Sequence, residues 1–294
     1  MKNDINQKKY PVMYMVITLV ICWGLGILYT IFSNGFSASF SDPAVLVAMC
    51  APTLAALIIY GITGGKPAIK NILKKFLIRR EQLFWIPVII SLNLLFFLIV
   101  RFGLILLGIE VPEITLTLNQ QLKEMIINFF EEIGVIGGAM GWVGFLIPYF
   151  QTKFNNNIKA GIMAGLGIGL FVIPGYAISA FGLVALYPLY VLQMVTFMVL
   201  YSYIFNLTDG NLMLYVILLW VNSSGSRMQL YYFAPPSQIL QTGAFALAAF
   251  GFHMLTRNKI KMELVKLPQY FLEVSKTVEL RGKNIGTIYE NEGR

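Results

Sequence analysis

Apolar stretches of about 20 residues recur along most of this chain, and each is long enough to cross the ~30 Å hydrocarbon core of a bilayer as an α-helix. The composition agrees with this reading, because 57% of the 294 residues are hydrophobic and only 12% are charged. A typical globular domain carries about 25% charged residues. The sequence therefore predicts an all-α fold, a polytopic membrane helical bundle.

The apolar stretches predict about eight transmembrane helices. They cover residues 12–32, 43–62, 83–107, 126–150, 160–178, 182–205, 212–222 and 237–255. Every segment rich in Lys and Arg then falls on one side of the membrane, which the positive-inside rule identifies as the cytoplasmic side. Both termini are therefore expected in the cytoplasm, with a transmembrane domain over residues 1–256 and a basic cytoplasmic tail over residues 257–294.

The basic segment over residues 64–82 combines six Lys and Arg residues with apolar residues at helical spacing, among them Ile69, Ile72 and Phe76. This pattern predicts an amphipathic helix on the inner leaflet, attracted to anionic lipid. The excess of Lys and Arg that gives the net charge of +8 lies in such membrane-flanking segments. We therefore expect the lipid bilayer as a partner and no nucleic acid.

The predicted fourth span, residues 126–150, carries two adjacent carboxylates, Glu131 and Glu132. Charged side chains at membrane depth are costly and by default indicate a functional site. Arg101, Lys123 and Arg227 are their candidate partners near the outer face. Three roles remain open for the pair: structural carboxylates at the interface, a binding site, or catalysis.

Small residues recur every four positions in the fourth and fifth spans, a spacing that lets helix backbones approach closely in lipid. The residues are Gly134 and Gly138, Gly137 and Gly141, and Gly161, Gly165 and Gly169. Because no strand precedes Gly165-Leu166-Gly167-Ile168-Gly169, this segment is not read as a nucleotide-binding loop.

Several short motifs occur in an order that resembles a known family. They are Cys22-Trp23-Gly24, Ala51-Pro52-Thr53-Leu54-Ala55-Ala56-Leu57 followed by Thr63-Gly64-Gly65-Lys66, Gly141-Trp142-Val143-Gly144-Phe145-Leu146-Ile147-Pro148, and Asn206-Leu207-Thr208-Asp209-Gly210. Together they resemble the CPBP family, the intramembrane CAAX-protease and bacteriocin-processing (Abi) group. The third motif is similar to the family's Gly-Trp-Arg-Gly-Phe-Leu-Leu-Pro. The resemblance extends over most of the chain.

The resemblance implies a chemistry that needs a Glu-Glu-x-x-x-Arg motif and two later helices that carry His, the second usually with Asn. Glutamates of this kind activate a water, while His and Asn stabilise an oxyanion or help to hold a metal. In this chain the corresponding positions are Gly138, Ala139, Val143, Val172, Trp220 and Ser224. The one histidine, His253, lies in the eighth span near the basic tail and is interpreted as an interfacial residue. Neither a metal nor a cofactor is expected, because no His, Cys and carboxylate set has zinc-like spacing.

The sequence therefore favours a non-catalytic, CAAX-protease-like protein of the bacterial plasma membrane, multi-pass and expected to be inactive. It would bind or regulate a membrane or envelope partner, in bacteriocin immunity or cell-envelope control, with Glu131, Glu132, Trp142 and Trp220 as binding residues. One alternative is an active intramembrane endopeptidase that uses Glu131 and Glu132 as its catalytic residues. The other is a transporter or channel component.

Overall fold

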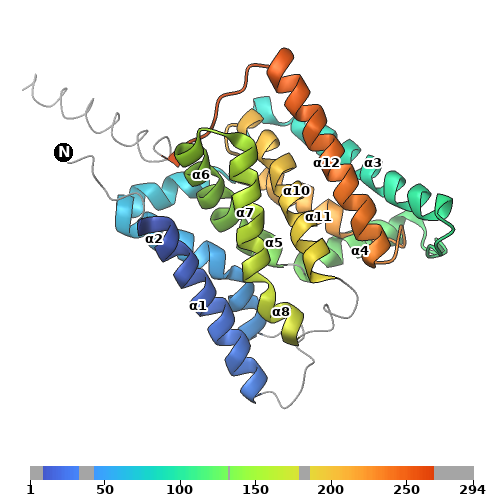
Figure 1. The fold of residues 1–294 in the computed structure, drawn as a ribbon, viewed down its shortest axis with the longest axis horizontal. Coiled ribbons are helices and arrows are strands. Elements are labelled where there is room, and N and C mark those ends of the chain that lie inside the picture. The colour runs from blue at the N-terminus through green and yellow to red at the C-terminus, as the bar shows by residue number, and fades with distance from the viewer. Residues whose placement is uncertain (1–8, 33–42, 132, 179–185, 268–294) are drawn as a thin grey trace, which may run out of the picture.

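The structure is a computed structural model, and it describes residues 9–32, 43–131, 133–178 and 186–267. Within these ranges every regular element is helical (Figure 1), as predicted. Five helices there are long and apolar enough to cross a membrane. They are α1 (Lys9–Phe32), α2 (Pro43–Lys74), α3 (Trp85–Leu106, preceded by the 3-10 turn η1, Arg80–Gln82), α10 (Tyr187–Leu207) and α12 (Pro235–Asn258).

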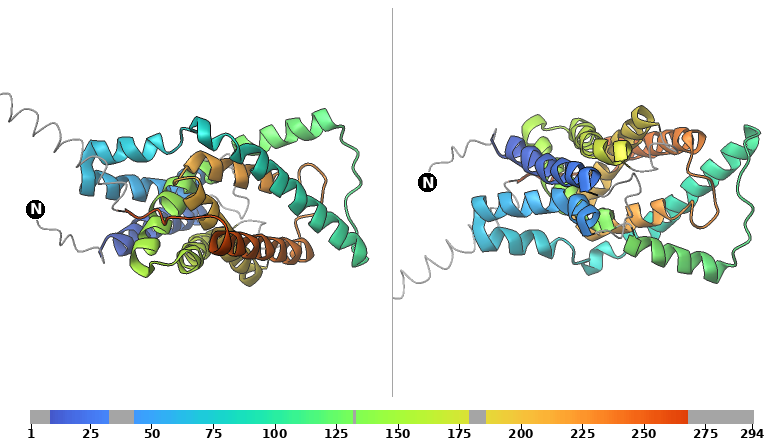
Figure 2. Two further views of the ribbon diagram at one scale, coloured as in Figure 1. Left: turned by 90° about the horizontal axis from the view of Figure 1, so that it is seen from above. Right: turned by 90° about the horizontal axis from the view of Figure 1, so that it is seen from below.

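Two further apolar helices are shorter, α7 (Asn157–Phe171) and α11 (Leu212–Ser223). The membrane-protein character and the all-helical fold are thus confirmed, whereas the count of eight spans and the cytoplasmic termini stay predictions. Viewed along both directions, α1 and α2 lie side by side at one edge of the bundle, and α3 and α12 lie at the opposite edge (Figures 1 and 2). Helices α7, α10 and α11 fill the space between them.

Helix α2 continues past the predicted end of the second span and includes the predicted amphipathic segment only as far as Lys74. The two parts join at Gly65, whose φ of 62° and ψ of −158° are not helical. A positive φ of this kind is readily adopted only by glycine, so the sequence permits a bend at this residue. Beyond it, Ile72 is fully buried while Lys66 and Lys70 are exposed, which is the two-sided pattern that the spacing predicts.

The predicted fourth span is composed of several helical segments. They are α4 (Leu118–Glu131), α5 (Ile133–Gly138), the π-helix η2 (Ala139–Leu146) and α6 (Ile147–Phe154). The helix therefore begins at Leu118, inside the stretch that the sequence assigns to an outer loop. The π-helix was not predicted, because its i→i+5 hydrogen bonds widen the turn without a recognisable residue pattern. The Tyr60 hydroxyl of α2 donates to the Gly144 carbonyl of η2 at 2.6 Å.

The prediction of close glycine packing is confirmed between α7 and α10. A methyl group added at Gly161 would lie 2.6 Å from the Val199 Cα atom, and one at Gly165 would lie 2.5 Å from the Val195 Cα atom. Both distances are shorter than a carbon–carbon contact of about 3.5 Å. Glycine is therefore needed at these two positions for the helix backbones to touch.

Candidate functional site

The positions that the resemblance assigns to the Glu-Glu-x-x-x-Arg motif lie inside the bundle and are packed. Ala139 and Val143 on η2 are fully buried. A side chain added at Gly138 would place its Cβ atom 2.7 Å from Cδ1 of Trp142. This region holds neither an acid nor a base at the expected positions, and it has no room for one without a shift of Trp142.

Trp142 itself belongs to the apolar core, with an exposed fraction of 4%. Its ring makes edge contacts with Phe171 at a centroid distance of 5.3 Å and with Tyr14 at 5.9 Å. It is thus enclosed between α1 and α7. A ligand could reach the Trp142 indole only after these helices had moved apart. The neighbouring Val172, at the expected position of the first histidine, is half-buried.

Trp220 lies in a different environment, where α11 meets α4. Its indole Nε1 donates to the Met125 carbonyl at 2.7 Å, and its ring packs edge-on against Phe129. The two tryptophans expected to form one binding site therefore contact different helices.

Ser224, at the expected Asn position, also joins α11 to α4. It is fully buried, its hydroxyl donates to the Trp220 carbonyl at 2.8 Å, and it accepts a hydrogen bond from Asn128 Nδ2 at 3.2 Å. The same Asn128 amide donates to Ser223 Oγ at 2.9 Å. Asn128 was not predicted as a site residue, although it is a polar residue within the apolar run before Glu131.

The carboxylate Glu131 ends α4 and binds Arg227 from the loop that follows α11. The same guanidinium lies 3.6 Å from the Glu124 carboxylate, two helical turns earlier on α4. We call Glu124, Glu131 and Arg227 the rim cluster. Their side chains are 35%, 49% and 36% exposed, so water and other molecules can reach them. Of the three candidate partners for the carboxylates, Arg227 is the one that Glu131 contacts, while Glu132 lies outside the described residues.

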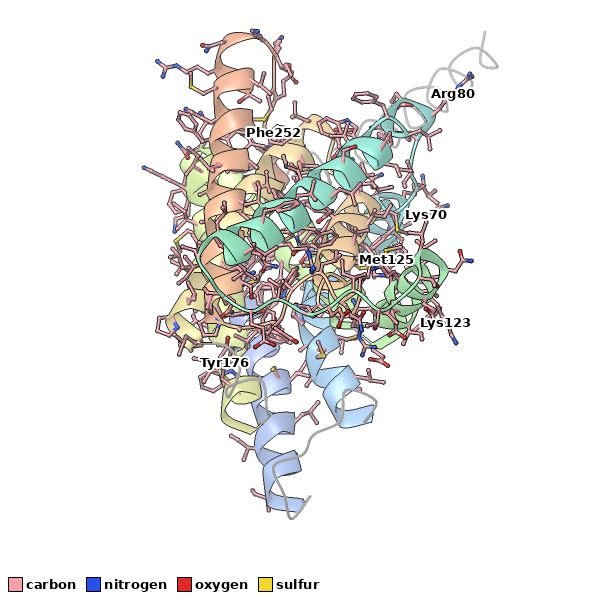
Figure 3. The ribbon with its side chains drawn as sticks, turned by 90° about the vertical axis from the view of Figure 1, so that its right-hand side faces the viewer. Lys70, Arg80, Lys123, Met125, Tyr176 and Phe252 are labelled. Carbon is pink, nitrogen blue, oxygen red and sulfur yellow. The ribbon has the colours of Figure 1, made fainter. Side chains whose placement is uncertain are left out.

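Backbone contacts hold the loop that carries Arg227 in place. The Arg101 guanidinium donates to the carbonyls of Pro112, Gln229 and Leu230 at 3.2–3.3 Å. The Gln229 side chain accepts from the Thr115 backbone N–H at 2.9 Å. Arg101, expected to reach towards the outer interface, thus ties the α3–α4 connection to the α11–α12 loop. In Figure 3, Lys123 of α4 lies well below Arg80, which is at the upper right.

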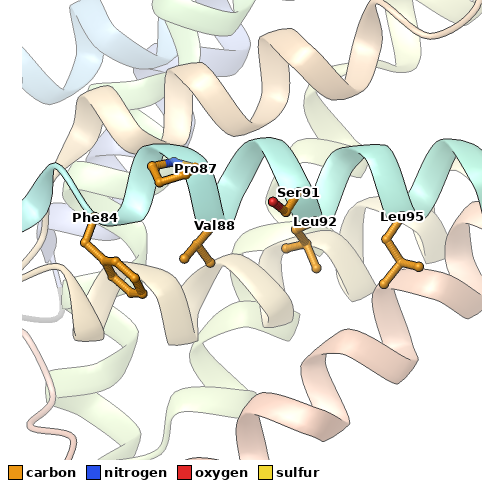
Figure 4. A pocket seen from close by; sticks show the side chains of 6 residues that line it. All are labelled: Phe84, Pro87, Val88, Ser91, Leu92 and Leu95. Atoms are coloured by element: carbon orange, nitrogen blue, oxygen red, sulfur yellow. The ribbon is translucent and has the colours of Figure 1, made fainter.

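Two cavities lie away from Trp142 and Val143. One, of about 390 Å³, runs along α3 and is lined by Phe84, Pro87, Val88, Ser91, Leu92 and Leu95. All six side chains come from one face of that helix (Figure 4), which is what a membrane helix presents to lipid. The other, of about 260 Å³, adjoins His253. Among the described residues no three His, Cys, Asp or Glu side chains are grouped so that they could hold a metal ion.

Comparison with known proteins adds no assignment, because no protein-family model matches the sequence and no curated protein matches it at a significant level. The family resemblance therefore depends on the motifs quoted above.

Proposed function

We propose that this chain is a non-catalytic, CAAX-protease-like protein of the bacterial plasma membrane that binds a membrane or envelope partner. On this proposal it crosses the membrane about eight times, has both termini in the cytoplasm, and serves bacteriocin immunity or control of the cell envelope. The observation that carries the proposal is the contrast in chemistry between two places. Ala139 and Val143 are apolar and buried, whereas the charged rim cluster is accessible.

The rim cluster is suited to binding because it is charged, positioned and partly open. Two carboxylates share one guanidinium, which leaves an excess negative charge. A cationic side chain on a partner can therefore pair with Glu124 or Glu131 without displacing buried groups. Rim charges of this type contribute to partner choice and association rate more than to affinity. This supports a surface that recognises a basic segment of another membrane or envelope protein.

The alternative role as an endopeptidase finds less support. The Glu131 carboxylate is paired with Arg227, so it is already engaged by a protein group. The residues that would have to stabilise an oxyanion are Val172, Trp220 and Ser224. The Trp220 indole N–H and the Ser224 hydroxyl both donate to backbone carbonyls.

Photocrosslinking in native membranes tests the proposal. A photoreactive amino acid at Gln120 or Lys123, both exposed on α4, should crosslink one specific protein. The yield should fall in the Glu131→Lys variant, which removes the excess negative charge of the rim cluster. The same amino acid at the exposed Lys66, on the basic segment of α2, is the matched control and should not capture that protein.

A cleavage assay tests the alternative directly. The full chain in liposomes is incubated with prenylated and unmodified peptide libraries, and the products are read by mass spectrometry. No peptide should be cleaved by the wild-type protein above the level of empty liposomes. Cleavage by the wild type that disappears in Glu131→Gln would overturn the non-catalytic proposal.

A further inference from the structure

The cavity of about 260 Å³ lies where α12 ends. Its walls come from the α6–α7 turn, α10, the last turns of α12 and the segment that follows α12. Figure 1 shows this segment running from the end of α12 back towards α6. The backbone N–H of Val265 holds it there by donating to Asn206 Oδ1 at 2.8 Å. The cavity is therefore a fixed feature of this end of the bundle.

Most of the polar groups in the cavity can donate hydrogen bonds. Arg257 lines it and makes no ion pair within the described part of the chain. His253 lines it too, with its Nδ1 atom 2.9 Å from the Tyr203 hydroxyl. No Asp or Glu side chain is among the lining residues. The cavity is thus chemically suited to an anion.

A buried amide in the wall supplies an independent sign of a ligand. Asn157 is 7% exposed, and its Oδ1 atom accepts from Gln151 Nε2 at 3.0 Å and from Asn206 Nδ2 at 2.6 Å. The Nδ2 group on the other side of the amide makes no hydrogen bond in the described part of the chain. The Tyr203 hydroxyl lies near it and also contacts His253. Because a hydroxyl can donate and accept at once, it could accept one of the two Nδ2 N–H groups, which leaves the other without an acceptor. A buried amide N–H without an acceptor costs about 1–3 kcal/mol, and an anionic oxygen in the cavity would remove that cost.

The first two residues of α7, Asn157 and Ile158, also line the cavity. The first N–H groups of a helix have no partner within the helix, and with the helix dipole they favour an anion at this end. Asn156 caps only the Lys159 N–H, at 2.8 Å. The amide and the helix start, both on α7, thus converge with the guanidinium of α12.

The residues around the cavity are of the kinds found at a membrane–water interface. Phe252, one residue before His253, stacks on Trp85 at a centroid distance of 6.5 Å, and aromatic residues concentrate at the membrane–water interface. Arg257 lies about one helical turn beyond that level. Basic pockets between membrane helices at such a level bind anionic headgroups.

We propose that the cavity formed by Asn157, Tyr203, His253 and Arg257 binds a phosphate group, either that of an anionic phospholipid or free phosphate. The inference does not depend on the function proposed above. Arg257 supplies the charge-assisted contact, and Asn157 with the start of α7 supplies neutral donors.

Native mass spectrometry of the full chain in detergent tests this inference. The protein is titrated with phosphatidylglycerol, with phosphatidylcholine of the same chain length, and with inorganic phosphate. Phosphatidylglycerol should bind roughly tenfold more tightly than phosphatidylcholine, because the choline cation of the latter offsets its phosphate charge and is repelled by Arg257. Competition by millimolar phosphate would identify free phosphate as a sufficient ligand, whereas binding of the lipid without such competition would identify the headgroup.

Variants make the test specific to the cavity. Arg257→Gln should weaken phosphatidylglycerol binding about tenfold, and Arg257→Lys should weaken it less because the charge is kept. Lys259→Gln removes the same charge two residues away, outside the cavity, and should have less than about a twofold effect. Equal binding of the two lipids by the wild type, together with no detectable binding of phosphate, would overturn the proposal. So would equal losses in Arg257→Gln and Lys259→Gln.

Discussion

The interior around η2 is buried and apolar, whereas the rim cluster is charged and partly exposed. Around η2, Val143 and Trp142 are enclosed by apolar side chains, and Gly141 has room for nothing larger, because an added Cβ atom would lie 2.5 Å from the Pro52 carbonyl oxygen. At the rim, Glu124, Glu131 and Arg227 are a third to a half exposed. Substitutions in the interior should therefore change the free energy of unfolding strongly. The rim side chains can form new ion pairs with little effect on the fold.

The largest effect is expected from a charge placed in the interior. Val143→Arg restores the residue type of the resembled motif, but Val143 is fully buried and has no carboxylate at Gly138 or Ala139 to pair with. An uncompensated buried charge costs several kcal/mol, so little folded protein should be recovered after membrane extraction, as measured by size-exclusion chromatography. Leu106→Arg, at a position that is 86% exposed near the end of α3, should be tolerated. Normal folding of Val143→Arg would show that the interior is open.

The second largest loss of stability is expected from a methyl group added at the α7–α10 contact. Gly165→Ala places its Cβ atom 2.5 Å from the Val195 Cα atom, so the two helices must separate. Overpacking of this kind typically costs about 1–3 kcal/mol, and the thermal unfolding midpoint in detergent should fall by several degrees. Gly251→Ala on α12, where an added Cβ atom meets nothing within 4 Å, should leave the midpoint unchanged or raise it. Equal midpoints for the two variants would contradict the close packing.

A smaller effect is expected where α11 meets α4. Trp220→Phe keeps an aromatic ring against Phe129 but leaves the Met125 carbonyl without its donor. The expected loss is about 1–2 kcal/mol, read from the same unfolding midpoint. Trp85→Phe is the matched control, because the Trp85 ring stacks on Phe252 and phenylalanine can still do so. The prediction fails if the two substitutions destabilise the protein equally.

The smallest effect on stability should come from the rim itself. Glu131→Gln and Arg227→Gln should each change the free energy of unfolding by only about 0.2–1 kcal/mol, and less at high salt, because exposed ion pairs are weak and screened. A double-mutant cycle on this pair measures the coupling. Capture of the crosslinked partner should nevertheless decline in Glu131→Gln, which lowers the negative charge of the rim cluster, and should not decline in Arg227→Gln, which raises it. A destabilisation as large as that of Gly165→Ala would show that the rim is structural.

Sequence reasoning predicts the helices well where one physical signal dominates. The third and seventh spans agree with α3 and α11 to within about two residues, because a long apolar run bounded by polar residues leaves few choices. The glycine spacing likewise predicted that α7 packs closely on a neighbour, although it did not predict that the neighbour is α10. The π-helix and the hydrogen bond between Tyr203 and His253 depend on which helices become neighbours, and no local pattern encodes that.

The candidate site was predicted only in part, because local sequence patterns do not show which helices and loops become neighbours. Glu131 and Arg227 were paired as one of three options because both fall near one predicted face. Choosing among the options required the position of the loop after α11, which Arg101 fixes through three backbone carbonyls. Trp142 and Trp220 were both predicted as binding residues from their positions in the resembled motifs. In the structure, Trp142 packs against α1 and α7, whereas Trp220 packs against α4.

The bend at Gly65 also determines where the basic part of α2 points. From Pro43 to the bend, α2 rises roughly 33 Å at about 1.5 Å per residue, close to the ~30 Å thickness of the hydrocarbon core. If this part of α2 crosses a bilayer, the exposed Lys66 and Lys70 would follow near the lipid phosphates. A residue unable to adopt a positive φ at position 65 would straighten this helix and carry the two charges away from their place in the bundle. The placement of the basic segment thus depends on one backbone torsion.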